Sequence, residues 1–294
     1  RLAAQGALDA EQVAAAARER VPTARRTFPA LAPHLTERLH AAHPEAVRIA
    51  TTLDAPLQRA AEALARRAVA GQEAQVTVAM ILADHQSGEV LAQVGAADYS
   101  DEARAGYVDM TTALRSPGST LKPFIYALAF DDGLAHPETL IEDRPIAFGD
   151  WRPQNFDRQF RGTVNARAAL QASLNIPAVS LMEAVGPARL LATLKRAGVA
   201  TELAGTPGLA VALGGVGISL EGLVQAYAAL ARLGAPIVLS PAPGGAAPLM
   251  QPLFGPVAGW QVADILAGLP PPAGGAWGRI AYKTGTSYGH RDAL

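Results

Sequence analysis

Three short polar motifs, which stand in one order along the chain, constrain its fold more than any other feature. In the first, a serine precedes a lysine by three positions. In the second, a serine precedes an asparagine by two, and in the third, lysine, threonine and glycine are consecutive. A fold that gathers the motifs builds a site for chemistry, whereas a fold that separates them leaves ordinary polar segments. The motifs are Ser119 to Lys122, Ser173 to Asn175, and Lys283 to Gly285.

The first motif predicts a nucleophile and its base. Pro117 and Gly118 break the chain and predict a helix that starts near Ser119. Lys122 then lies one turn later on the same face. A lysine whose pKa is lowered by burial or by nearby cations could take the serine proton, and free N–H groups at the helix start could bind an oxyanion. A capping serine followed by a solvated lysine explains the same residues without chemistry.

Lysine is rare in this chain. Of its 25 basic residues, only Lys122, Lys195 and Lys283 are lysines. Arginine keeps its proton near neutral pH, whereas a buried lysine can lose it. Two of the three lysines lie inside the motifs, which favours a chemical role for them. Lys195 is expected to be a surface charge near a helix C-terminus.

The second motif lies just before Pro177. Because proline pushes the preceding residue out of helical geometry, we expect residues 173–175 to end a helix and lie in a loop. Ser173 and Asn175 alternate along the chain, so the hydroxyl and the carboxamide can point the same way. A polar helix C-terminus is the alternative interpretation.

The third motif follows the apolar residues 280–282, and together they predict a strand over 280–287. In a regular strand Lys283 and Gly285 face one side, and Thr284 and Thr286 face the other. Glycine lets a substrate backbone come close, and an ammonium with hydroxyls can bind a carboxylate. An ordinary polar strand end is the alternative.

The rest of the pattern predicts an α+β fold in which helices cluster against a sheet. Two β-rich runs, over 76–84 and 89–95, flank a polar turn and predict a hairpin. A short strand is expected over 48–53, and Pro29 and Pro33 mark a turn region. Helices are predicted over 9–20, 54–68, 165–174, 186–197, 219–233 and 260–268, the first two capped by Asp9 and Asp54.

Composition excludes several classes of protein. The length of 294 residues allows one large domain or two modest ones, and 50% hydrophobic residues supply a core. The net charge of -1 gives no basic excess for nucleic acid, and the absence of cysteine excludes disulfides and thiol catalysis. The uncharged stretches 203–220 and 233–263 are broken by glycine and proline, so neither predicts a membrane span. His40 and His43 lack a nearby acidic helper, so we expect no metal site and no cofactor.

The sequence resembles the transpeptidase domain of class A penicillin-binding proteins, and most closely their 1C branch. Residues 116–124 look like the nucleophile segment of that family. Residues 152–156, ahead of the second motif, and residues 212–215 also match. The resemblance runs from about residue 47 to the end. It predicts a transpeptidase domain over 47–294, whereas residues 1–46 are similar to the helical tail and linker of a glycosyltransferase domain.

The resemblance implies the fold of penicillin-binding proteins and serine β-lactamases, with an antiparallel sheet and a helical subdomain. It also implies the reaction. Ser119 attacks the carbonyl between the two D-alanines of a peptidoglycan stem peptide, Lys122 acts as the base, and Ser173 relays a proton to the leaving amine. The backbone N–H groups of Ser119 and Thr286 would form the oxyanion hole.

The same resemblance implies the binding roles. Asn175 would bond the substrate amide, and the amine of a neighbouring stem would resolve the acyl-enzyme into a crosslink. β-Lactam antibiotics would imitate the dipeptide and stall as acyl adducts. Other cell-wall synthesis proteins are further implied partners, and the implied location is the periplasmic face of the bacterial inner membrane, with the anchor outside this chain. The terminal carboxylate region would be bound by Lys283, Thr284, Gly285 and Thr286.

Two alternatives remain open. A D,D-carboxypeptidase or β-lactamase-type serine hydrolase would use the same motifs but pass the acyl group to water, although the chain has no Glu-x-x-Leu-Asn run of the kind a class A β-lactamase uses to deacylate. A catalytically impaired penicillin-binding or scaffold module is the other. The family continues past the third motif with two further strands and a helix, so we expect this chain to be cut at both ends and its sheet to have unpaired edges.

Overall fold

The computed structural model describes residues 5–6, 9–18, 30–203, 205–287, 289 and 291–294. The chain divides into two compact units, residues 1–30 and residues 31–294. The expected boundary at residue 46, between a glycosyltransferase tail and a transpeptidase domain, stays a prediction.

The first unit contains the helix α1 (Ala10–Arg18). The Asp9 carboxylate accepts a hydrogen bond from the Gln12 backbone N–H at 2.7 Å, and the Gln12 side chain accepts one from the Asp9 N–H at 3.0 Å. This reciprocal pair is a capping box and confirms Asp9 as the cap. The predicted helix end at residue 20 and the turn at Pro29 lie outside the described residues.

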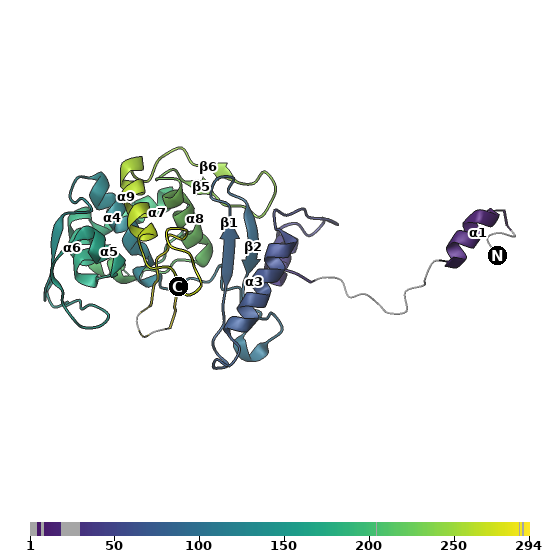
Figure 1. The fold of residues 1–294 in the computed structure, drawn as a ribbon, viewed down its shortest axis with the longest axis horizontal. Helices are drawn as coiled ribbons and strands as arrows, with labels where there is room; N and C mark the ends of the chain where they lie inside the picture. Colours follow the sequence, from purple (N-terminus) through teal and green to yellow (C-terminus); the bar gives the residue numbers. More distant parts are fainter. Residues whose placement is uncertain (1–4, 7–8, 19–29, 204, 288, 290) are drawn as a thin grey trace. The chain divides into compact units, whose positions relative to one another are not determined.

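The second unit contains the predicted hairpin. Strand β1 (Met80–Ala83) pairs antiparallel with β2 (Val90–Val94), and α3 (Ala55–Ala68) packs against β2 (Figure 1). Asp54 caps α3 by accepting a hydrogen bond from the Leu57 N–H at 2.8 Å, as the sequence predicts. Small apolar side chains from α3 and β2, such as Ala65 and Val94, form the core between them.

A helical layer surrounds α4 (Lys122–Asp131), whose residues 122–130 are all buried. A helix that is apolar on every side must be enclosed by others, and α4 contacts α5, α6, α7 and α9. These neighbours are α5 (Ala166–Gln171), α6 (Asn175–Val185), α7 (Pro187–Arg196) and α9 (Pro256–Ala267), and α8 (Leu220–Ala231) packs against α9.

The remaining elements are short, and the strands form three separate two-stranded antiparallel sheets. Together with the helical layer they confirm the α+β class. These elements are α2 (Pro33–Ala42), the strands β3 (Leu140–Asp143), β4 (Gly162–Asn165), β5 (Ile237–Val238) and β6 (Ala247–Pro248), and the 3₁₀ turns Glu102–Arg104, Gly118–Leu121 and Leu209–Leu213.

Two predicted strands are wrong. Residues 280–287 form no strand, because in the described structure no strand pairs with them: the backbone of Gly285 bonds only Leu294, and Thr286 makes one isolated bridge to Ala293. Residues 48–53 form none either, although the Thr52 N–H donates to the Pro241 carbonyl at 2.8 Å. A strand requires a neighbouring strand, and a local residue pattern does not show whether one lies alongside.

Helix starts differ from expectation at three prolines. Pro33 begins α2 instead of marking a turn, and Pro256 begins α9 four residues ahead of the predicted start. The helix α6, which was not predicted, carries Pro177 in its first turn. Proline fits the first turn of a helix because the backbone N–H groups there have no partner within the helix.

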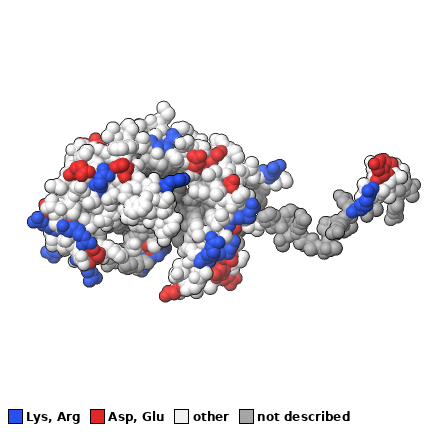
Figure 2. Space-filling model, in the orientation of Figure 1, with Lys and Arg blue, Asp and Glu red and all other residues white. Residues whose placement is uncertain are grey.

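The surface and the helix lengths add two observations. On the face drawn in Figure 2, basic and acidic side chains are interspersed over much of the larger unit, so no broad field of one sign covers that face. Within the described residues, every helix is too short or too polar to pass through a lipid bilayer.

Candidate active site

Ser119 lies in the 3₁₀ turn Gly118–Leu121, which leads directly into α4. The predicted helix start is therefore shifted, because the α-helix begins at Lys122 itself. Gly118 has φ +52°, a conformation that glycine adopts without strain. The turn leaves the Ser119 side chain partly exposed, whereas Lys122 is fully buried.

One local hydrogen bond and two from distant segments hold this turn. The Thr120 hydroxyl donates to the Pro117 carbonyl at 2.7 Å, and the Tyr227 hydroxyl, from α8, donates to the Thr120 carbonyl at 2.8 Å. The Ser116 hydroxyl donates to the Gly214 carbonyl at 2.8 Å. The backbone around Ser119 is therefore fixed by tertiary hydrogen bonds.

Lys122 is the centre of the site. Its Nζ donates to the Ser173 carbonyl at 2.6 Å and to Asn175 Oδ1 at 2.6 Å, and Ser173 Oγ lies 3.4 Å away. Burial, with a further contribution from the charge of Lys283, holds the pKa of Lys122 well below its usual value. A neutral amine has two N–H donors and one lone pair, and the two carbonyl-type acceptors use both donors. The lone pair therefore remains available to accept a proton.

The structure thus brings Lys122, Ser173 and Asn175 together by direct hydrogen bonds. Ser119 stands one turn before Lys122, but its hydroxyl donates no hydrogen bond to Lys122 or to any other residue that the structure describes. Catalytic hydrogen bonds are often long or poorly aligned without substrate, so this spacing is compatible with a nucleophile and base.

Ser173 adopts a strained backbone conformation with φ +54°. It ends α5 in a Schellman motif, in which the Ser173 N–H donates to the Leu170 carbonyl and the Leu174 N–H donates to the Ala169 carbonyl, both at 3.0 Å. Glycine usually fills this position because other residues are strained there. The conformation aims the Ser173 carbonyl and hydroxyl at Lys122, which gives the strain a role in the site.

Asn175 is the first residue of α6, so the expectation of a loop at this position is wrong. Its Nδ2 donates to the Gln154 carbonyl at 2.6 Å, which leaves Oδ1 to face Lys122. Its backbone N–H donates to Asn155 Oδ1 at 2.7 Å. Of the 152–156 segment, Gln154 therefore orients the Asn175 side-chain amide, and Asn155 holds the Asn175 backbone.

The third motif packs against the Ser119 turn, and a glycine lies at each point of close approach. A Cβ placed on Gly285 would lie 2.7 Å from the Pro117 carbonyl oxygen, and one on Gly118 would lie 2.5 Å from the Thr286 carbonyl oxygen. Glycine is needed at both positions for this approach. The backbone N–H groups of Ser119 and Thr286 donate no hydrogen bond to any described residue.

Lys283 is the charged residue of the third motif, and it is partly buried. Burial lowers its pKa to about 8. Its Nζ donates to the carbonyl of the neighbouring Thr284 at 2.7 Å. Its charge acts on Lys122, so the first and third motifs are electrostatically coupled.

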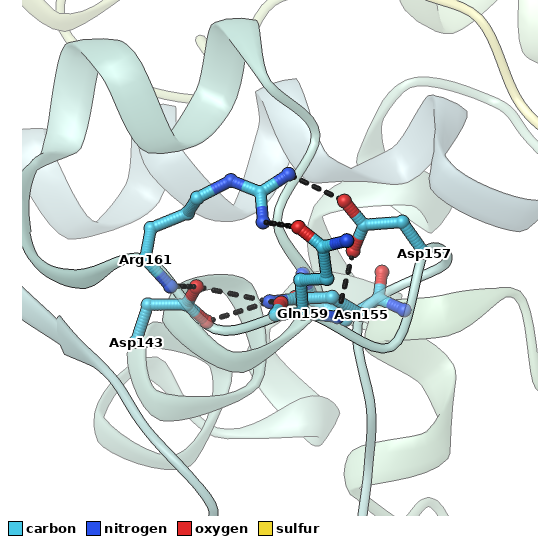
Figure 3. A network of polar contacts seen from close by, with 6 residues as sticks. Asp143, Asn155, Asp157, Gln159 and Arg161 are labelled. Carbon is cyan, nitrogen blue, oxygen red and sulfur yellow. Dashed lines mark hydrogen bonds and ion pairs between the residues drawn. The ribbon is translucent and has the colours of Figure 1, made fainter.

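Two further residues of the site were not predicted. Asn155 belongs to the 152–156 segment on which the resemblance partly rests, but the resemblance implies no role for it, and no motif includes Asp143. Asp143 is fully buried and hydrogen-bonded to Asn155 (Figure 3). A lone acidic residue carries no local signal, because its partner is 12 residues away.

A serine one turn before a buried lysine, with a second serine and an asparagine on that lysine, is the arrangement of serine–lysine acyl-transfer enzymes. The sequence model of the family described as "Penicillin binding protein transpeptidase domain" matches residues 78–242. This match includes the first two motifs and covers more than half of the chain. The chain therefore belongs to the penicillin-binding protein transpeptidase family.

Relatives and solved structures agree with this assignment. The chain is 42% identical over 300 residues to penicillin-binding protein 1C of Escherichia coli K12, which covers all of this chain and 39% of that relative. A peptidoglycan glycosyltransferase from Burkholderia ambifaria shares the fold, with a TM-score of 0.68 and 23% identity over 81% of this chain and 82% of its own. PonA1 of Mycobacterium tuberculosis in complex with penicillin V has a TM-score of 0.67 and 21% identity, over 82% and 72% of the two chains.

Two glycines near the site should respond to alanine in opposite ways. A Cβ on Gly214, which has φ +91°, would lie 2.4 Å from the Gly118 nitrogen, so Gly214→Ala should lower the free energy of unfolding by about 1–3 kcal/mol or more. Gly208 has φ -118° and open space around it, so Gly208→Ala should raise that free energy by about 0.4–1 kcal/mol. Urea unfolding of both variants measures the difference. Equal effects would contradict the close packing of Gly214 on the Ser119 turn.

Proposed function

We propose that this chain carries a peptidoglycan D,D-transpeptidase site that works through an acyl-enzyme on Ser119. The observation that supports it most strongly is the hydrogen bonding of Lys122, because a fully buried amine with both donors used is poised as a base one turn from a serine. Membership of the penicillin-binding protein family supports a role in peptidoglycan synthesis and penicillin binding. The chain spans 39% of the matched relative, so the activity of the whole protein is part of the proposal.

In the proposed acylation, Lys122 takes the proton of the Ser119 hydroxyl while Oγ attacks the carbonyl carbon between the two D-alanines. The N–H groups of Ser119 and Thr286, both without a partner in the described structure, stabilise the resulting oxyanion. Ser173, 3.4 Å from the lysine amine, returns the proton to the leaving nitrogen as the C–N bond breaks. The terminal D-alanine leaves with that proton.

In the second step, Lys122 takes a proton from the amine of a neighbouring stem peptide as that amine attacks the acyl carbon. The bond from this carbon to Ser119 Oγ breaks, and the proton passes to Oγ. Before acylation, Asn175 bonds the substrate amide, and the third motif binds the terminal carboxylate through the Lys283 ammonium and the threonine hydroxyls. Gly285 keeps this motif close to the Ser119 turn. A β-lactam carries the same amide and carboxylate, so it acylates Ser119 and blocks the site. The proposed binding residues are Asn175, Lys283, Thr284, Gly285 and Thr286.

The proposal extends to the setting of the protein. The substrate is the stem peptide ending in D-Ala-D-Ala, so the site would operate on the periplasmic side of the inner membrane, where other cell-wall synthesis proteins are its expected neighbours. A D,D-carboxypeptidase or β-lactamase-type hydrolase is the second candidate, since the same acyl-enzyme can pass to water. Adding a D-amino acid or an amino-terminated stem peptide to the acylated protein separates the two, because only a transpeptidase joins the acyl group to the amine.

Substitution of the nucleophile tests the acyl-enzyme directly. Ser119→Ala should abolish labelling by a fluorescent penicillin and remove the corresponding mass increase, because no other serine stands one turn before Lys122. Ser180→Ala is the matched control, since Ser180 donates only to the Ile176 carbonyl within α6. The protein should carry its natural flanking sequences. Equal labelling of wild type and Ser119→Ala, or a folded wild type that is never acylated, would refute the proposal.

The pH dependence of acylation should be bell-shaped. The rate should rise with pH as Lys122 becomes neutral, at a pH well below 10.5, because its pKa is lowered. It should fall above about pH 8, where Lys283 loses the charge that holds the carboxylate. Lys283→Arg keeps that charge, so it should move the alkaline limb to higher pH, whereas Lys195→Arg on an exposed helix position should not.

The measurement is the rate of labelling by fluorescent penicillin across pH 5–10.5, from reactions that are quenched at timed intervals. An alkaline limb that is unchanged in Lys283→Arg would show that Lys283 does not bind the carboxylate. A rate that stays at zero until the ordinary lysine pKa is reached would show that Lys122 is not a neutral base.

A further inference from the structure

A buried polar pair, Asp143 and Asn155, is hydrogen-bonded to the backbone N–H of Asn175. Figure 3 shows the pair with its neighbours Asp157, Gln159 and Arg161. Asp143 ends β3 and is fully buried, and both of its carboxylate oxygens accept a hydrogen bond from Asn155 Nδ2 at 2.9 Å. One oxygen also accepts from the Arg161 backbone N–H at 2.7 Å. The Arg161 side chain contacts Asp157 and Gln159 instead, and no cationic side chain contacts Asp143 among the described residues.

Hydrogen bonds fix the orientation of the Asn155 side chain between Asp143 and Asn175. Asn155 Nδ2 donates to Asp143 and to the Gln159 carbonyl, so Asn155 Oδ1 must face the Asn175 N–H. Asn175 in turn presents Oδ1 to Lys122 Nζ. A buried carboxylate accepts hydrogen bonds only, so it defines which end of Asn155 points at it. Asp143 and Asn155 thus hold the Asn175 backbone at the start of α6, and the Gln154 carbonyl, which accepts from Asn175 Nδ2 at 2.6 Å, turns Oδ1 toward Lys122.

We propose that Asp143 and Asn155 are positioning residues for acylation, which hold Asn175 so that its side-chain oxygen stays on Lys122. This inference rests on the function proposed above. A buried charge without a counterion costs stability unless its hydrogen bonds compensate, and a purely structural contact at this place could be made by apolar residues. The pair is instead polar, and it holds the backbone N–H of Asn175, the residue whose side chain contacts the base.

The pair also borders the helix that carries the base. Tyr126 lies one turn after Lys122 on α4, and its hydroxyl is buried without a hydrogen-bond partner among the described residues. Burial, and then the charge of Asp143, raise the pKa of Tyr126. Asp143 therefore acts on the same face of α4 as Asn175, one turn apart. On this face of α4, the charge of Lys283 acts on Lys122, and the charge of Asp143 acts on Tyr126.

The test compares acylation by fluorescent penicillin in Asp143→Asn and Asn155→Ala with wild type, in the protein with its natural flanking sequences. Asp157→Asn is the matched control, because Asp157 is exposed in the same loop and pairs with Arg161 away from the site. Both site variants should acylate about tenfold or more slowly, since a small displacement of a catalytic group costs this much. The control should acylate like wild type.

The pH profile separates positioning from a loss of stability. When the Asn175 oxygen is no longer held on Lys122, the ammonium form loses an acceptor and is less favoured, so the acidic limb should move to lower pH in both variants. A stability defect alone would lower the melting temperature and leave the limb in place. Asp143→Asn keeps the shape of the side chain, so it remains informative if Asn155→Ala does not fold.

The outcomes are distinct from those that test the proposed function. Wild-type protein that is not acylated would refute the proposed function itself. Wild type that is acylated, together with folded variants that match it in rate and in pH profile, would overturn only the positioning role. Slower acylation with an unmoved acidic limb would likewise assign the pair a structural role.

Discussion

The requirement to bury a lysine at the start of a buried helix governs the rest of this structure. A charged ammonium in an apolar interior is costly, so the group becomes neutral unless a counterion accompanies it. Here its partners are the Ser173 carbonyl and the Asn175 side-chain oxygen, which are dipoles without net charge. The two oxygens accept the hydrogen bonds of the Lys122 amine, and no carboxylate pairs with it in the described structure. A salt bridge at the same position would stabilise the protonated form and remove the base.

Several local features follow from that requirement. The strained turn at Ser173 points its carbonyl at the Lys122 amine. The helix α6 starts at Asn175, and this places the Asn175 side-chain oxygen on the same amine. Glycines at 118 and 285 let the third motif approach the serine turn within distances that a Cβ would block. The charge of Lys283, placed nearby, lowers the lysine pKa further. Acyl transfer thus depends on packing as much as on the identity of the catalytic groups.

The sequence was sufficient to predict what depends on neighbouring residues. The caps at Asp9 and Asp54, the hairpin and the helical character of most segments follow from local rules, and the motif order indicated which side chains would meet. The predicted strand over 280–287 failed because strand pairing depends on what lies alongside. Prediction of a loop at Asn175 failed because Pro177 was taken to exclude helix, although it fits a first turn. The pair of Asp143 and Asn155 has no signature within either local segment.

The protonation state of Lys122 is the point on which the account depends most. The chain has only three lysines, so ¹⁵N labelling of the lysine amines gives a short set of resonances whose titration NMR can follow. Lys122→Met identifies the resonance of Lys122 by its disappearance. We predict that this amine titrates well below 10.5, with Lys283 near 8. A Lys122 resonance that stays protonated until the pH of an ordinary lysine would contradict the account.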